Sequence, residues 1–154
     1  MTIEFFVDTK DAGSPFPHYR EQCVGSCHAI MGTRADWREK LEKCQRELGF
    51  QYVRFHGLLN DEMSVCKKDA SGSLSYSFFN IDSIFDFLLK IGMKPFIELS
   101  FMPEALASGT ANCFHYKANI TPPGRLCAVG SAGQGADPAP TEAVWIGRSA
   151  QLVF

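Results

Sequence analysis

Thr33-Arg-Ala-Asp-Trp-Arg-Glu-Lys-Leu-Glu-Lys-Cys-Gln-Arg-Glu-Leu-Gly49, followed directly by Phe50-Gln-Tyr-Val-Arg-Phe55, is the stretch that decides the fold. Its first part has apolar residues at helical spacing, with Thr33 as a candidate cap and Gly49 as the stop. These apolar positions are Trp37, Leu41, Cys44 and Leu48. Its second part is aromatic and β-branched, which is typical of a strand. The stretch therefore predicts a helix that leads into a strand.

The same order of elements recurs downstream. A second helix is predicted from about Asn80, a candidate cap, to Gly92, and Pro95 forbids its continuation. Pro95-Phe-Ile-Glu-Leu99 then reads as another short strand. Alternating helices and strands predict an α/β fold with a parallel sheet. The Gly-rich phosphate fingerprint of dinucleotide-binding folds does not occur between a strand and the following helix, so that version of the fold loses support. In either an open sheet or a barrel, the loops that leave the strands, residues 56–79 and 100–121, should carry the site.

The first of these loops contains a predicted β-hairpin. Met63-Ser-Val-Cys-Lys67 and Leu74-Ser-Tyr-Ser-Phe78 flank a polar stretch at residues 68–73, with Gly72 in the turn. Because the hairpin falls between a strand and the next helix, we expect it to be an insertion in the alternating pattern.

Composition excludes several classes of protein. The chain of 154 residues is 45% hydrophobic and 21% charged, which is typical of a globular domain, and its net charge of −2 gives no reason to expect nucleic acid or an anionic membrane as a partner. No apolar run approaches the roughly 18 residues that cross a bilayer. The acidic N-terminus, Met1-Thr-Ile-Glu-Phe-Phe-Val-Asp8, lacks the features of a secretory signal, so we expect a cytoplasmic location.

Cysteine spacing provides only a weak metal signal. The chain contains six cysteines, which are Cys23, Cys27, Cys44, Cys66, Cys113 and Cys127. Cys23, Cys27 and His28, with Cys44, could be a zinc or redox site, but the second cysteine pair of a zinc knuckle is missing. We expect free thiols, no metal and no cofactor.

The last 31 residues differ from the rest of the chain. From Gly124 to Phe154, 15 of 31 residues are Gly, Ala, Ser or Pro, and no Lys occurs. We therefore divide the chain into a body at residues 1–123 and an irregular tail at residues 124–154. The hypothesis that the reading frame slips near Pro123 is tested by translating the other frames of the DNA.

Six phrases of the body occur in the order found in one family of enzymes. They are Val53-Arg-Phe-His-Gly-Leu-Leu-Asn-Asp61, Tyr76-x-Phe-Phe-Asn80, Ile84-Phe-Asp-Phe-Leu88, Pro95-Phe-Ile-Glu-Leu-Ser-Phe-Met-Pro103, Ala107-Ser-Gly-Thr110 and Asn119-Ile-Thr-Pro-Pro123. Together they resemble the N-terminal part of the catalytic domain of glycoside hydrolase family 39, the bacterial β-xylosidases, with α-L-iduronidases as distant relatives. The resemblance implies a partial (β/α)8 TIM barrel of about three β/α units.

The resemblance also implies a reaction and a substrate. Family members hydrolyse xylo-oligosaccharides or other glycosides by a retaining mechanism, with two glutamates about 5 Å apart. The acid/base of the family lies in an Asn-Glu-Pro motif that these 154 residues lack, and the nucleophile comes later still. We therefore expect no catalytic residue in this chain and no hydrolysis by the chain alone.

Three residues are predicted to bind substrate. His56 leaves a strand at the site edge and matches a family position whose imidazole lies in the sugar pocket. His115 and Tyr116, in Phe114-His-Tyr116, could form an aromatic wall for a pyranose ring, or alternatively belong to a core strand.

Three acidic residues are given structural roles. We expect Glu98 to be neutralised by Arg54 inside the barrel, and Asp61 with Glu62 to form a solvated acidic turn.

A different class of function stays open. The partial barrel could be a non-catalytic carbohydrate-binding or assembly module that uses His56, Tyr116 and the hairpin. An unpaired sheet edge is also expected to cause self-association.

Overall fold

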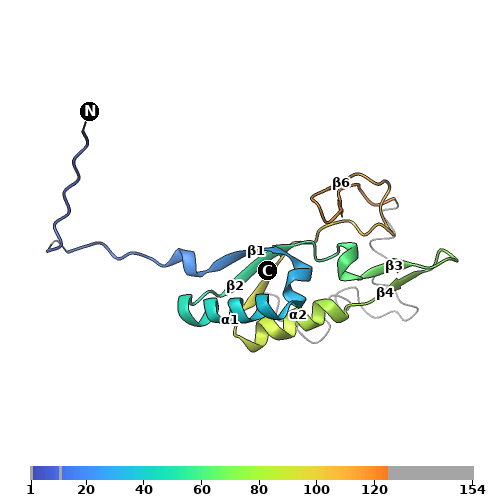
Figure 1. The fold of residues 1–154 in the computed structure, drawn as a ribbon, viewed down its shortest axis with the longest axis horizontal. Helices are drawn as coiled ribbons and strands as arrows, with labels where there is room; N and C mark the ends of the chain where they lie inside the picture. Colours follow the sequence, from blue (N-terminus) through green and yellow to red (C-terminus); the bar gives the residue numbers. More distant parts are fainter. Residues whose placement is uncertain (1, 11, 125–154) are drawn as a thin grey trace.

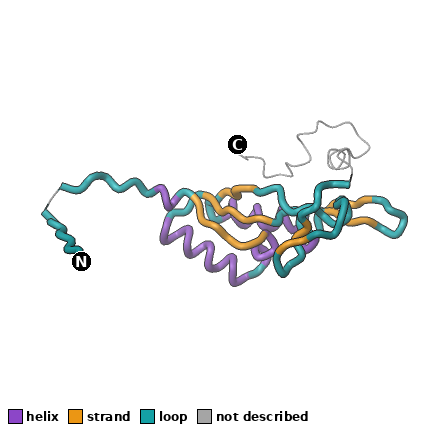
Figure 2. Tube along the Cα trace, turned by 90° about the horizontal axis from the view of Figure 1, so that it is seen from above, coloured by secondary structure: helices purple, strands orange, loops and turns teal. Residues whose placement is uncertain are grey.

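The computed structural model describes residues 2–10 and 12–124 (Figure 1). Within these residues, the N-terminal segment and the predicted hairpin project from opposite ends of the body, as Figures 1 and 2 both show. Residues 125–154, which include Cys127 and all but the first residue of the tail predicted at residues 124–154, lie outside the described residues. The frame slip near Pro123 stays a prediction.

A parallel three-stranded sheet forms the centre of the body. Its strands are β1 (Cys23–His28), β2 (Tyr52–His56) and β5 (Lys94–Ile97), in the order β1-β2-β5. Helices α1 (Ala35–Leu48) and α2 (Phe79–Lys90) connect them and lie on one side of the sheet (Figure 1). The prediction of an α/β fold with a parallel sheet is confirmed. Neither helix of the described chain is long and apolar enough to cross a bilayer.

Strand β1 is an element that the sequence did not predict. Cys23-Val-Gly-Ser-Cys-His28 contains a single β-branched residue, so its composition gives no strand signal. Its place in the sheet comes from pairing with β2, where Val24 is opposite Val53. The Trp37 indole N–H donates to the Ser26 hydroxyl at 2.8 Å and so attaches β1 to α1.

The predicted helix caps are wrong, whereas the predicted stops are correct. Thr33 closes the short 3-10 helix η2 (Ala29–Thr33), and its hydroxyl donates to the carbonyl of Ile30 at 2.7 Å, so it does not cap α1. Asn80 lies inside α2, and its amide donates to the carbonyl of Met63 at 3.1 Å. Gly49 and Gly92 follow the two helices with φ of 72° and 76°, a conformation that glycine adopts without strain.

The predicted hairpin is confirmed, with shorter strands. Strand β3 (Cys66–Lys68) pairs antiparallel with β4 (Leu74–Tyr76), and Gly72 in the turn has φ of 88°. The Asp69 carboxylate accepts hydrogen bonds from the backbone N–H groups of Ser71 and Ser73, which stabilises the turn.

The hydrophobic core lies between the sheet and the two helices. Val53 of β2 and both Ile84 and Leu88 of α2 are fully buried, and Phe55 is 2% exposed. Gly32 approaches Ile84 so closely that a Cβ on Gly32 would lie 3.0 Å from a side-chain carbon of Ile84. The burial of Val53 and Phe55 in this core holds β2 in place and thereby positions His56 at its C-terminal end.

Candidate functional site

The C-terminal ends of β1 and β2 bring two imidazoles together. His28 is the last residue of β1, His56 is the last residue of β2, and the two are paired in the sheet register. Parallel strands end at the same edge of a sheet, and in α/β folds this edge carries the site. The two rings lie 6.3 Å apart between centroids and are nearly parallel.

His56 contacts a residue 60 positions downstream. Its Nε2 lies 2.6 Å from the hydroxyl of Tyr116, so the structure brings these two predicted site residues into contact. Tyr116 lies in the turn between β6 (Asn112–Cys113) and β7 (Ala118–Asn119), so the alternative of a core strand for residues 114–116 is wrong. The cause is the backbone, because Phe114 and Lys117 adopt φ of 59° and 55°, which no strand allows.

His28 is a residue of this site that the sequence reasoning missed. Its side chain is almost entirely buried, its Nδ1 is hydrogen-bonded to the carboxylate of Glu62, and its ring stacks on Tyr116 at 4.1 Å between centroids. The interpretation of Glu62 as part of a solvated turn is therefore wrong. The short helix η3 (Asp61–Met63) directs Glu62 towards β1. Its position at the end of a parallel strand would have revealed His28, had β1 been predicted.

The five residues His28, His56, Glu62, Phe114 and Tyr116 are called the strand-end cluster below. The Phe114 ring lies 5.8 Å from the His56 ring and 5.3 Å from the Tyr116 ring, tilted by 17° and 14° respectively. His115, the third predicted site residue, is exposed and packs edge-on against Tyr116 at 5.1 Å. His115 therefore lies at the margin of the cluster.

The loop after β5 closes a further side of the cluster. The ring of Phe101 packs edge-on against His56 at 5.8 Å between centroids. The hydroxyl of Ser100 accepts a hydrogen bond from the N–H of Gly57 at 3.0 Å, and its carbonyl accepts one from the N–H of Leu59 at 2.8 Å. These bonds join the loop after β5 to the loop after β2.

Asp61 joins the same two loops. It is exposed, as expected for an acidic turn, but its carboxylate accepts hydrogen bonds from the N–H of Glu104 at 3.1 and 3.2 Å. Partial burial raises the pKa of Asp61 above its ordinary value, an effect that outweighs the opposing effect of the Glu104 N–H.

Glu98 pairs with Arg54, as predicted, at 2.6 Å between Oε1 and Nε. The two side chains are 29% and 58% exposed, so the expected enclosure of the pair inside a barrel is wrong for the described residues. The pair lies on the face of the sheet opposite to Val53 and Phe55, because side chains of a strand alternate between its faces.

The strand-end cluster combines flat apolar surfaces with hydrogen-bonding groups. Burial is the main cause that raises the pKa of Tyr116, and nearby Cys27, Cys113 and Glu62 act in the same direction, so the phenol stays protonated at neutral pH. A protonated phenol and an imidazole can exchange hydrogen bonds with hydroxyl groups, while ring faces pack against C–H surfaces. This combination fits a polyhydroxylated ligand with an apolar face.

Neither a metal site nor a disulfide occurs among the described residues. No group of three or more His, Cys, Asp or Glu side chains in this part of the chain could hold an ion. Cys23 and Cys27 are exposed, and the five described cysteines are free thiols, as predicted. The alternative of a zinc or redox site at Cys23, Cys27, His28 and Cys44 therefore has no support in the geometry.

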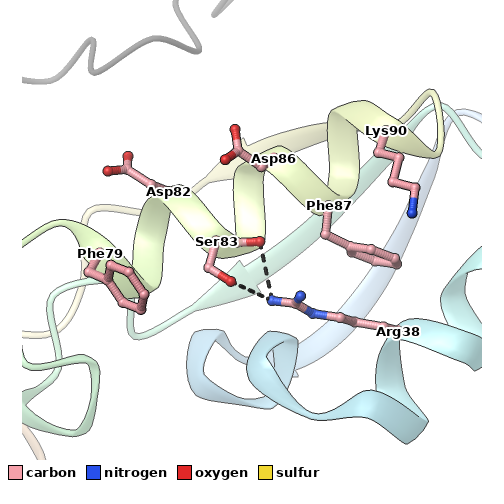
Figure 3. A pocket seen from close by; sticks show the side chains of 7 residues that line it. All are labelled: Arg38, Phe79, Asp82, Ser83, Asp86, Phe87 and Lys90. Atoms are coloured by element: carbon pink, nitrogen blue, oxygen red, sulfur yellow. Dashed lines mark hydrogen bonds between the residues drawn. The ribbon is translucent and has the colours of Figure 1, made fainter.

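A shallow groove of about 430 Å³ lies on the helices, among residues that do not belong to the cluster (Figure 3). The guanidinium of Arg38 donates to the carbonyl and hydroxyl of Ser83 at 3.2 and 2.9 Å, and its Nε donates to the carbonyl of Gly32 at 2.7 Å. Because Arg38 is engaged in joining α1 to α2, we interpret the groove as a consequence of helix packing.

Comparison with known proteins identifies relatives over most of the chain. The model of the family described as glycosyl hydrolases family 39 matches residues 3–130. A β-xylosidase of Caldicellulosiruptor saccharolyticus is 72% identical over 102 residues, and one of Geobacillus stearothermophilus is 38% identical over 104 residues. Each alignment covers 66% of this chain and 21% of the relative. The chain thus spans about a fifth of the length of these relatives.

Solved structures give the same result. A monomeric β-xylosidase from Caulobacter crescentus CB15 matches with a TM-score of 0.63 and 34% identity, over 72% of this chain and 22% of that one. The family 39 enzyme from Xanthomonas axonopodis pv. citri matches with a TM-score of 0.62 and 33% identity, over 70% of this chain and 21% of that one.

Proposed function

Because the chain belongs to glycosyl hydrolases family 39, we propose that its strand-end cluster is one wall of the sugar-binding site of a β-xylosidase-type hydrolase. The observation that carries the proposal is the hydrogen bond of 2.6 Å between His56 and Tyr116, which joins the end of β2 to the β6–β7 turn. The relatives are β-xylosidases, so the proposed ligand is a xylo-oligosaccharide or a related glycoside.

The arrangement of the rings supports this proposal. The rings of His56, Phe114 and Tyr116 are tilted by only 14° to 20° from one another, with centroids 5.3 to 6.0 Å apart, so they form an offset stack in which the 59% exposed Phe114 offers an aromatic surface. A pyranose ring has an apolar face that packs on such a surface and equatorial hydroxyls that hydrogen-bond with groups at its rim. The His28 ring lies under Tyr116, with Glu62 on its Nδ1, and holds this surface in place.

Hydrolysis requires more than this wall. A retaining glycosidase needs two carboxyl groups about 5 Å apart on opposite sides of the scissile bond. Glu62 is engaged with His28, Glu98 with Arg54, and Asp61 with the Glu104 N–H. We therefore propose that the 154-residue chain binds sugar but does not hydrolyse glycosides by itself.

Calorimetric titration of the purified chain with xylobiose tests the binding. Saturable heat is expected for the wild type and for a control variant, Leu89→Ala, which alters an exposed position of α2. The variant His56→Ala removes both a hydrogen-bonding group and a ring face, so its heat should fall to that of dilution. Equal binding by the His56→Ala and wild-type proteins would disprove the assignment.

The alternative function is a non-catalytic carbohydrate-binding module, in which the same residues form a complete site without further barrel units. The two functions differ in how the site depends on further barrel units. A chromogenic xyloside incubated with the chain should give no product, and xylobiose affinity should increase when the remaining units of a relative are present. Affinity that does not change on their addition would favour the binding module.

A further inference from the structure

Two thiols lie directly beside the strand-end cluster. Cys27 precedes His28 in β1, and Cys113 is the last residue of β6 and precedes Phe114. Each cysteine is therefore the chain neighbour of a cluster residue, although the two are 86 positions apart in the sequence. Both are free thiols, and neither is fully buried. The other described cysteines lie at the start of β1, in α1 and in β3, and they are Cys23, Cys44 and Cys66 respectively.

Tyr116 brings these two cysteines to the same place. It lies in the turn of the β6–β7 hairpin that follows Cys113, and Cys113 pairs with Ala118 on the other strand. Its ring stacks on His28, the neighbour of Cys27, at 4.1 Å between centroids. Both thiols also act electrostatically on the Tyr116 phenol, because after burial they are the largest causes that raise its pKa. The hairpin therefore places Cys113 close to the end of β1 that carries Cys27.

The strand that carries Cys113 is the outer strand of a short hairpin. The hairpin has two residue pairs and is anchored through β7, where Ala118 and Asn119 are buried. Asn112 of β6 is exposed, and Phe114 in the turn is 59% exposed, so packing does not lock this side of the hairpin. A disulfide requires a Cα separation of roughly 4.4–6.8 Å and a bond of about 2 Å between the sulfurs. An exposed strand at the end of a short hairpin can shift towards β1 to meet this geometry.

We propose that Cys27 and Cys113 form a reversible disulfide that displaces β6 and the adjoining Phe114, and so weakens sugar binding by the strand-end cluster. The rings of the cluster are assembled in the structure while both thiols are free. Because the two sulfurs must approach to about 2 Å, bond formation moves Cys113 and with it the Phe114 ring, which lies 5.3 Å from the Tyr116 ring between centroids. The effect on sugar rests on the proposed function, whereas the bond itself does not.

The reaction requires a disulfide oxidant, such as glutathione disulfide. The thiolate of Cys27, the more exposed of the two residues, attacks one sulfur of the oxidant and releases a glutathione thiolate. The thiolate of Cys113 then attacks the Cys27 sulfur of this mixed disulfide, and a second glutathione thiolate leaves. In total the two protein thiols lose two electrons and two protons, which the oxidant gains as it becomes two molecules of glutathione. An excess of glutathione reverses the reaction.

Peptide mapping of the full chain tests the bond without sugar. The chain is equilibrated with mixtures of glutathione and glutathione disulfide, the remaining thiols are alkylated, and tryptic peptides are analysed by mass spectrometry. We expect residues 21–34 to become linked to the peptide that contains Cys113, and the link to disappear in excess glutathione. Because residues 21–34 contain both Cys23 and Cys27, Cys27→Ser should abolish the link, and the control Cys23→Ser, at the other end of β1, should retain it. Thiols that stay alkylated, separate mixed disulfides with glutathione, or a link to any other cysteine would overturn the inference.

The displacement and its effect on sugar have separate readouts. In a chain labelled with ¹³C in the aromatic rings, oxidation should shift the resonances of Phe114 and Tyr116 with no sugar present. In calorimetry, oxidation should lower the affinity for xylobiose by roughly fivefold or more, the equivalent of one lost hydrogen bond. Cys113→Ser should bind equally well under both conditions. Unchanged resonances, or unchanged affinity in a chain that binds xylobiose when reduced, would contradict the displacement. No binding by the reduced chain would refute the sugar site, while the mapping and the resonances would still decide on the disulfide.

Discussion

Strand β2 contributes to two regions with opposite properties within five residues. Val53 and Phe55 pack into the dry core against α2, and the next residue, His56, enters the strand-end cluster with its imidazole bonded to Tyr116. The core is stabilised by apolar contacts among β2, η2, α1 and α2. The cluster is stabilised by polar and stacking contacts between residues 34 to 88 positions apart. The comparison predicts large effects on stability from core substitutions and mainly functional effects from cluster substitutions.

The largest effect should come from the core itself. Ile84→Ala truncates a fully buried side chain of the hydrophobic core and should destabilise the fold by roughly 2–5 kcal/mol. Leu89→Ala, at an exposed position of the same helix, is the control and should cost far less. Urea unfolding followed by circular dichroism measures both values, and similar losses would mean that α2 does not pack as described.

Overpacking at the same place should have a smaller effect. Gly32→Ala puts a Cβ 3.0 Å from Ile84, so either the side chain or the backbone of η2 must shift, at a cost of about 1–3 kcal/mol. Gly25→Ala is a suitable control, since a Cβ there meets no atom within 4 Å. A neutral Gly32→Ala variant would show that η2 is loosely packed.

The buried polar contact between His28 and Glu62 should contribute less to stability than the core does. Glu62→Ala leaves the Nδ1 of the buried His28 without its carboxylate partner, so we expect a loss of about 1–3 kcal/mol. Glu62→Gln retains a hydrogen-bond acceptor for His28 and should lose less stability. Equal stability of the wild type and Glu62→Ala in urea would contradict a structural role for this pair.

Loss of a single hydroxyl should separate binding from stability. Tyr116→Phe keeps the ring that stacks on His28 but removes the group bonded to His56, and should cost about 1 kcal/mol of stability or less. Xylobiose affinity should fall more than stability does, since the phenol is expected to contact the sugar. Unchanged affinity in calorimetry would exclude Tyr116 from the site.

The smallest effect should be the pH dependence of the loop contact at Asp61. Because the folded pKa is raised, the charged form is disfavoured in the folded state, and stability falls as pH rises through that pKa. The stability of Asp61→Asn relative to the wild type should therefore increase between acidic and neutral pH. Asp36, whose pKa is lowered by the guanidinium of Arg34, should give the opposite sign in Asp36→Asn. Urea titrations across this pH range measure both.

The comparison also explains which features the sequence could predict. Both helices, strands β2 and β5 and the β3–β4 hairpin follow from local periodicity and turn chemistry, and Gly49, Gly72 and Gly92 adopt the backbone conformations expected at stops and turns. Strand β1 was missed because Cys23-Val-Gly-Ser-Cys-His28 is a strand only through pairing with β2.

The site could be predicted in part for the same reason. His56 follows a strand that its own composition reveals, so its position at the site edge could be inferred. The partners of His28, Glu62 and Tyr116, lie 34 and 88 residues away, and no local pattern records such contacts. The predicted helix caps are wrong because the side chains of Thr33 and Asn80 donate hydrogen bonds to the carbonyls of Ile30 and Met63, and do not accept them from helix N–H groups.

The central claim is that the strand-end cluster binds sugar, and nuclear magnetic resonance tests it most directly. The chain is labelled with ¹⁵N in histidine and ¹³C in the aromatic rings, and xylobiose is added to the wild-type protein. The account predicts saturable shifts at His56, Phe114 and Tyr116, with none at His18, which lies in the N-terminal segment. Shifts confined to His18, or no saturable shift at His56 and Tyr116, would contradict it.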